Sequence, residues 1–214
     1  MNIYFIFLLI NISIILYFVY YIVKNYKKRE NFQILDDKYF FIHLKNVFDD
    51  KDYEYIKKNT NNKNLSKDKY ADNYSKYIYD KKINELIFSK TASILKNIQK
   101  IKKSNVLTEY RIYHNKSTGM KWHTDILMSD PPQYEVVFVV SNTSDSKTQI
   151  KLKNGKIKDI ISEGNDIIIV KGDGIKHRVT PITNRGTRSI IKAAFLPKKS
   201  KEIDQNVNFQ NNKY

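Results

Sequence analysis

Residues in the second half of the chain have the side-chain types and the spacing of a metal centre. A single residue separates His123 from Asp125, so in a β-strand their side chains would point to the same face. A second imidazole, from His177 on a later predicted strand, would complete a set of ligands on one side of an ion. Two histidines and one carboxylate leave the opposite side open, which suits non-haem Fe(II). The sequence therefore predicts a catalytic iron site.

A basic residue follows the second histidine at the start of the last predicted strand. The planar guanidinium of Arg188 can hold a carboxylate through two parallel hydrogen bonds. Tyr113 could add a hydroxyl donor to the same carboxylate, with Tyr110 as the alternative. Any one of these residues alone would more often be structural, so the prediction depends on their combination and order.

Two stretches carry a specific pattern. Tyr113 and Gly119 precede the letters WHTD at 122–125, and GDGIKHRVTPITNRGTRSII occupies 172–191. These segments resemble the 2-oxoglutarate/Fe(II)-dependent dioxygenase superfamily and, within it, the prolyl-4-hydroxylase-like branch. The resemblance covers about residues 31–198. The chain departs from the branch at 114–118, where polar residues replace Gly-rich text, so we expect its substrate loop to be individual.

The resemblance implies the roles of the site residues. His123, Asp125 and His177 would bind Fe(II), and Arg188 with Tyr113 would bind the co-substrate 2-oxoglutarate. O2 would be the oxidant, and ascorbate is a candidate additional reductant. The implied reaction is hydroxylation of a substrate C–H bond with decarboxylation of 2-oxoglutarate to succinate. A protein side chain, proline above all, is the expected target.

Two other functions remain open on sequence grounds. The formal net charge of +16 would favour nucleic acid, and a nucleic-acid-modifying 2-oxoglutarate oxygenase is the first alternative. Against it, the chain lacks the paired arginines and long base-flipping loops that such an enzyme would need. The second alternative is a non-enzymatic, cupin-like binding module whose metal is structural. The chain has no cysteine, which excludes disulfides and thiolate metal sites.

The N-terminal residues 3–23 form an apolar run without a charged side chain. As a helix the run would span about 30 Å, the thickness of the hydrocarbon core of a bilayer, so we expect a single transmembrane helix. Basic residues follow directly, at Lys24, Lys27, Lys28 and Arg29. By the positive-inside rule they place the catalytic domain on the cytoplasmic side of the membrane, with the lumenal side as the alternative.

The remaining pattern predicts the fold. Apolar residues recur at helical spacing over 83–98, and Asp49 and Asp50 could begin another helix. From 106 onward, several short strands follow one another with no helix between them, which is typical of a sandwich or jelly roll. We therefore expect a mainly β protein with supporting helices, a double-stranded β-helix (jelly roll), behind the transmembrane helix.

The predicted organisation has successive parts along the chain. They are a membrane anchor with its basic flank at 1–30, a mixed and partly helical support region at 31–105, the double-stranded β-helix at 106–198, and a polar tail at 199–214.

Overall fold

The computed structural model describes residues 13–17, 31–68 and 72–203. The chain divides into a unit of residues 1–31 and a unit of residues 32–214. In the first unit, residues 13–17 are helical. Most of the predicted transmembrane run and its basic flank lie outside the described residues. Among the residues that are described, no helix is both long and apolar enough to cross a membrane.

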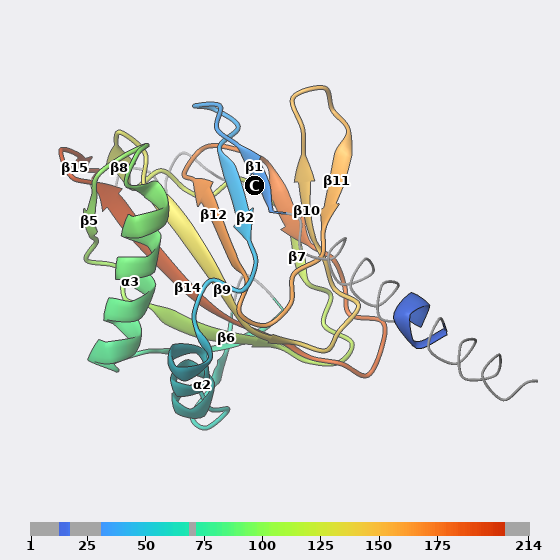
Figure 1. The fold of residues 1–214 in the computed structure, drawn as a ribbon. Helices are drawn as coiled ribbons and strands as arrows, with labels where there is room; N and C mark the ends of the chain where they lie inside the picture. The colour runs from blue at the N-terminus through green and yellow to red at the C-terminus, as the bar shows by residue number, and fades with distance from the viewer. Residues whose placement is uncertain (1–12, 18–30, 69–71, 204–214) are drawn as a thin grey trace, which may run out of the picture. The chain divides into compact units, whose positions relative to one another are not determined.

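The second unit contains a large antiparallel sheet (Figure 1). Its strand order is β1-β2-β12-β9-β14-β6-β4-β3, and β5 pairs with β14 at one end. The bounds are β1 Phe32–Ile34, β2 Phe41–Leu44, β3 Ser66–Lys67, β4 Tyr74–Tyr77, β5 Ile101–Lys103, β6 Glu109–Tyr113, β9 Tyr134–Asn142, β12 Ile167–Lys171 and β14 Arg188–Pro197.

A smaller sheet has the strand order β11-β10-β13-β7. Its bounds are β7 Met120–His123, β10 Thr148–Lys151, β11 Ile157–Ile160 and β13 His177–Val179; a separate pair joins β8 Ser129–Asp130 to β15 Lys201–Glu202. From β6 to β14 the chain crosses repeatedly between the large and the small sheet. This alternation is the double-stranded β-helix, so the predicted mainly β jelly roll is confirmed.

Helices α2 (Asp50–Asn59) and α3 (Lys81–Leu95) cover one face of the large sheet (Figure 1). Asp49 caps α2, because its carboxylate accepts from the Asp52 amide at 2.9 Å. Apolar residues at helical spacing in α3, such as Ile87, are buried in the same cluster as the strands beneath. Both predicted helices are present, and they act as a supporting layer.

The central strands β9 and β14 divide their side chains between the helices and the interior of the roll. Phe138 and Ile191 belong to the apolar cluster that includes α2 and α3. Val139 and Ile190, their neighbours along each strand, pack in a cluster on the opposite face. Because side chains alternate along a strand, Arg188 and Lys192 on β14, and Val137 and Glu135 on β9, point to the same face as Ile190 and Val139.

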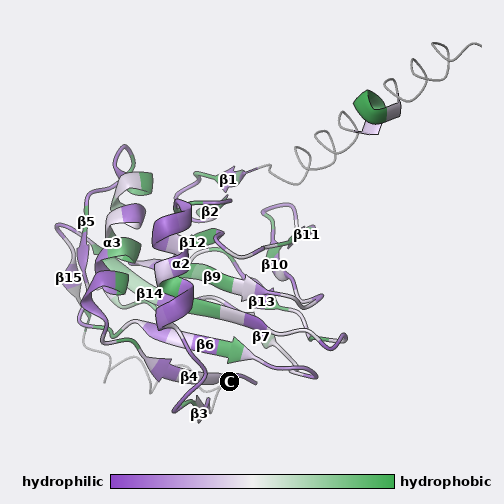
Figure 2. Ribbon diagram, turned by 60° about the horizontal axis from the view of Figure 1, so that its bottom comes forward, coloured by the Kyte–Doolittle hydropathy of each residue, from purple (hydrophilic) through white to green (hydrophobic). Residues whose placement is uncertain are grey.

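The support region predicted over 31–105 also contributes strands to one edge of the large sheet. It contains β3, and β4 follows and pairs with β6 at the edge of the large sheet. In Figure 2 these edge strands are mostly hydrophilic, whereas β9 and β12 are strongly hydrophobic. An edge strand with both faces exposed to solvent has no alternating apolar pattern, so its sequence resembles that of a loop.

Candidate metal and co-substrate site

The fold brings His123, Asp125 and His177 together. One potential ligand atom from each residue lies within 4.8 Å of the others. The two histidines face each other across the antiparallel pair of β7 and β13, with ring centroids 4.3 Å apart. Oδ2 of Asp125 lies 3.5 Å from Nε2 of His177. Pairing of β7 with β13 therefore brings the two imidazoles together, and the carboxylate of Asp125 lies beside them.

The position of Asp125 differs from the expectation that it shares a strand with His123. Strand β7 ends at His123, and Asp125 lies in the loop that follows. Its backbone carbonyl accepts a hydrogen bond from the amide of Asp173 at 2.9 Å. This contact ties the loop to the turn before β13, so the carboxylate reaches the histidines without strand geometry.

Backbone carbonyls orient both imidazole rings. Nδ1 of His123 lies 2.8 Å from the carbonyl of Lys121, and Nδ1 of His177 lies 2.9 Å from that of Ile175. Because a carbonyl only accepts, each Nδ1 donates its hydrogen, and the lone pair of the neutral ring is on Nε2. Histidine ligands in metal sites are commonly fixed in this way. The donor set therefore fits a divalent ion.

The charge states of these groups suit metal binding. Burial, reinforced by the nearby His177, lowers the pKa of His123 and favours its neutral form. Burial acts to raise the pKa of Asp125, but Lys192 and the two histidines outweigh it and lower that pKa overall. The site thus offers an ionised carboxylate beside a neutral imidazole.

Arg188 is almost fully buried and only partly hydrogen-bonded. Its side chain is 1% exposed, and Nη2 donates to Oγ1 of Thr148 at 2.9 Å. Nε and Nη1 are buried without a partner among the described residues. Burial lowers the pKa of Arg188. Since unpaired buried donors on a cation are costly, this guanidinium fits an anionic group that accepts from it.

Tyr113 and Tyr110 lie on opposite faces of β6. Tyr113 is directly opposite Arg188 in the pairing of β6 with β14, and it packs in the interior cluster. Tyr110 belongs to the cluster on the helix side, where its hydroxyl donates to Oδ1 of Asn62 at 3.0 Å. The structure therefore places Tyr113, and not Tyr110, on the same side as Arg188.

The other arginines of this segment do not enter the interior. Arg178 lies over the ring of Trp122, 4.9 Å from its centroid, and donates from Nε to Gln149 at 2.7 Å. Both Arg178 and Trp122 neighbour a histidine of the site and point to the other face of their strands. Arg185 is exposed in the turn before β14.

Sequence reasoning missed Lys192 and Glu135. Nζ of Lys192 lies 3.2 Å from Oδ1 of Asp125 and 3.5 Å from Oε2 of Glu135. Burial raises the pKa of Glu135, whereas the two carboxylates outweigh burial and raise the pKa of Lys192. Two features of the sequence could have indicated them. Glu135 is a charged residue within the apolar strand β9, and Lys192 lies four residues after Arg188, on the same face of β14.

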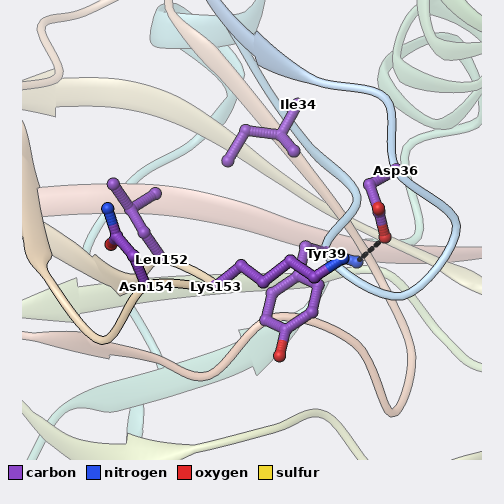
Figure 3. Close-up of a pocket in the computed structure, with 6 residues that line it drawn as sticks. All are labelled: Ile34, Asp36, Tyr39, Leu152, Lys153 and Asn154. Carbon is purple, nitrogen blue, oxygen red and sulfur yellow. Dashed lines mark hydrogen bonds between the residues drawn. The ribbon is translucent and has the colours of Figure 1, made fainter.

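A pocket of about 430 Å³ opens between the turn after β1 and the hairpin of β10 and β11 (Figure 3). It is lined by Ile34, Asp36, Tyr39, Leu152, Lys153 and Asn154. None of the proposed metal ligands lines it. Leu152 packs in the same apolar cluster as Ile175, whose backbone carbonyl accepts from Nδ1 of His177.

Comparison with known proteins supports the fold. No family model matches the chain, and no curated protein matches it in sequence. Among solved structures, a Pseudomonas putida prolyl-4-hydroxylase matches with a TM-score of 0.59 at 9% identity, over 74% of this chain and 92% of its own. HygX from Streptomyces hygroscopicus, with nickel and 2-oxoglutarate bound, matches with a TM-score of 0.57 at 9% identity, over 76% and 85%.

A Trichoplax adhaerens prolyl hydroxylase, in complex with a peptide fragment of hypoxia inducible factor, matches with a TM-score of 0.56 at 11% identity, over 74% and 84%. These neighbours are 2-oxoglutarate/Fe(II) oxygenases, and they include prolyl hydroxylases. The chain thus has the fold of the 2-oxoglutarate/Fe(II) oxygenases, and the resemblance inferred from its motifs is confirmed at the level of the fold.

Proposed function

We propose that the chain is an Fe(II)- and 2-oxoglutarate-dependent dioxygenase that hydroxylates a C–H bond of a protein side chain, with proline as the first candidate. One observation carries the proposal. The convergent donors of His123, Asp125 and His177 share the interior of the roll with the unpaired guanidinium donors of Arg188. A metal-ligand set beside a buried anion site is what binding of a metal and a 2-oxoacid requires.

Each residue has a role in this reaction. Nε2 of His123, Nε2 of His177 and Oδ2 of Asp125 would hold Fe(II). Arg188 would bind the distal carboxylate of 2-oxoglutarate through guanidinium N–H groups that have no partner among the described residues, with Tyr113 as a further donor. The bound iron and co-substrate would supply the oxidising chemistry, in which 2-oxoglutarate, O2 and the substrate C–H become succinate, CO2 and C–OH.

The surrounding side chains would keep the anion site dry. Val139, Ile182 and Ile190 are buried in one cluster with Tyr113, on the face of the sheet from which Arg188 projects. In such an environment a charged hydrogen bond to the co-substrate carboxylate is stronger than in water.

The proposal of a protein substrate rests on two kinds of support. The structural neighbours include prolyl hydroxylases, and one of these holds a peptide. The open pocket beside the β10–β11 hairpin would give an extended chain an additional apolar contact on the same unit. HygX has also been solved with hygromycin B bound, so the fold alone does not select the substrate.

We further propose that residues 3–23 anchor the enzyme in a membrane, with the second unit on the cytoplasmic side. The uncharged run and the basic residues after it support this proposal. Glycosylation mapping tests it through the sequons that begin at Asn64, Asn73, Asn115 and Asn142. Glycan addition at these sites in microsomes would place the domain in the lumen and contradict the proposed orientation.

Succinate formation tests the proposed activity. The full-length protein, in mild detergent with Fe(II), 2-oxoglutarate and air, is compared with the His177→Ala and Arg188→Ala variants, while peptides and nucleic acids are screened as substrates. We expect turnover that is lost in His177→Ala and needs more 2-oxoglutarate in Arg188→Ala. Arg185→Ala changes an exposed arginine of the same segment and is the matched control. Turnover that is equal in all four proteins would contradict the assignment.

A further inference from the structure

Lys192 is enclosed between two carboxylates inside the roll. Its Nζ lies 3.2 Å from Oδ1 of Asp125 and 3.5 Å from Oε2 of Glu135. The side chain of Lys192 is 26% exposed, whereas those of Asp125 and Glu135 are 8% and 6% exposed. The three charges come from β14, from the loop after β7 and from β9, so the cluster joins both sheets.

The cluster continues into the loop that carries Asp125. Nε2 of Gln133, a fully buried residue, donates to Oε1 of Glu135 at 3.1 Å and to the carbonyl of Ile126 at 2.6 Å. Oε1 of Gln133 accepts from the amide of Met128 at 2.9 Å. The loop that follows Asp125 is therefore tied to the glutamate that faces Lys192.

Stability alone is a weak reason for this arrangement. Val137 and Ile190, the nearest neighbours on the same face of β9 and β14, are apolar. A buried ion pair is commonly no more stabilising than apolar residues of similar size, because both charges lose their hydration. Within the cluster, Oδ1 of Asp125 contacts Lys192, whereas Oδ2 lies towards His177. That division is useful to a metal ligand.

We propose that Lys192 is a positioning residue for the metal centre: it holds Oδ1 of Asp125, so that Oδ2 alone faces the ion. Glu135 balances the charge of Lys192 and limits its repulsion of the ion. A carboxylate that binds through one oxygen keeps the remaining positions open for the 2-oxoacid and O2. The inference deepens the proposed function and rests on it.

The test measures the binding of Co(II) to the full-length protein, without turnover. The visible absorption of bound Co(II) reports its coordination. Lys192→Met removes the ammonium and keeps the length of the side chain. We expect Co(II) affinity to fall about 10- to 100-fold, the usual effect of losing an outer partner of a ligand, and the absorption spectrum to change. Loss of a positive charge by itself would strengthen cation binding, so the sign of the change separates positioning from electrostatics.

Further variants keep the result interpretable if Lys192→Met alters packing. Lys192→Arg retains donors to Asp125, and we expect it to recover most of the affinity and the wild-type spectrum. Glu135→Gln retains Lys192 and should change affinity less than Lys192→Met does. The double variant Lys192→Met/Glu135→Gln removes the unpaired glutamate and should remain as weak as Lys192→Met. Thermal melting of the metal-free proteins verifies that each is folded.

The outcomes separate this inference from the proposed function. Co(II) affinity in Lys192→Met that equals or exceeds that of the wild type, with an unchanged spectrum, overturns the positioning role. Recovery of wild-type affinity in the double variant also overturns it, since Lys192 would then serve only Glu135. A wild-type protein that binds Co(II) no better than His177→Ala would instead overturn the metal centre itself.

Discussion

Arg188 and Thr148 are joined by a single hydrogen bond of 2.9 Å across the roll, while Nε and Nη1 of the same guanidinium remain without a partner among the described residues. Thr148 lies in the small sheet and Arg188 in the large one. The hydrogen bond fixes one edge of the guanidinium and leaves the other donors for a ligand. These donors support the proposed binding of the co-substrate carboxylate at this place.

Replacement of Arg188 by alanine should weaken 2-oxoglutarate binding. Hydrogen bonds to charged groups contribute about 1.5–3 kcal/mol, so we expect a loss of about 10- to 100-fold in affinity. Calorimetric titration of the metal-loaded protein measures it, and Arg185→Ala is the control. Equal affinity in the wild type and Arg188→Ala would place the co-substrate elsewhere.

The two tyrosines of β6 should behave differently. Tyr113→Phe removes a hydroxyl on the side of Arg188, and we expect a loss of about fivefold in 2-oxoglutarate affinity, corresponding to about 1 kcal/mol for one hydrogen bond. Tyr110→Phe removes a hydroxyl that donates to Asn62 and should leave this affinity unchanged. The same titration compares both variants, and the opposite ranking would favour Tyr110 as the contact.

Gly119 should be required for the pairing of the two strands that carry the histidines. Its φ is +74°, and an added Cβ would lie 2.3 Å from the carbonyl oxygen of Val179 on β13. Gly155 has a similar φ of +79° but open space around it. We expect Gly155→Ala to cost about 1 kcal/mol of unfolding free energy through backbone strain alone.

Gly119→Ala should cost more than Gly155→Ala and should also weaken Co(II) binding, because the clash pushes β7 away from β13. Urea denaturation and Co(II) titration measure the two effects. Similar losses in both variants would mean that the backbone adapts around Gly119 and that its close approach is unimportant.

Asp145 should make the free energy of unfolding depend on pH in the acidic range. Its carboxylate accepts from the hydroxyl and the amide of Thr183, and these bonds hold its pKa below the ordinary value of 3.8. A lowered folded-state pKa gives a stabilisation that is complete above the unfolded-state pKa and is lost as pH falls through the folded-state pKa.

We therefore expect the wild type to be more stable than Asp145→Ala at about pH 6, with the difference shrinking towards about pH 3. Urea denaturation midpoints across this range measure the difference. A difference that does not vary with pH would assign the effect to packing and not to the ionised carboxylate.

The elements that the sequence predicts well are those with a buried face. The apolar run of β9 and the helical spacing of α3 both reflect packing against one core, so their patterns are visible in the chain. Strands β3 and β4 lie at the solvent-exposed edge of the sheet, and their sequences have no regular apolar pattern. The N-terminal run lies mostly outside the described residues and stays a prediction.

The candidate site also contains residues that the sequence pattern identifies and residues that only the fold reveals. His123, Asp125, His177 and Arg188 are found from residue type and order, and the structure brings the first three together. The contact of Lys192 with Asp125 depends on where the loop after β7 passes the face of β14, which no local pattern encodes. Tyr113 could be separated from Tyr110 only once the faces of β6 were known.

The most direct test of the account is a titration of 2-oxoglutarate into the Fe(II)-loaded, full-length protein without oxygen, followed by calorimetry. It needs no knowledge of the substrate. We expect that one equivalent binds, that binding requires the metal, and that Arg188→Ala weakens binding while Arg185→Ala does not. A folded protein that binds Fe(II) through His123, Asp125 and His177 but takes up no 2-oxoglutarate would contradict it.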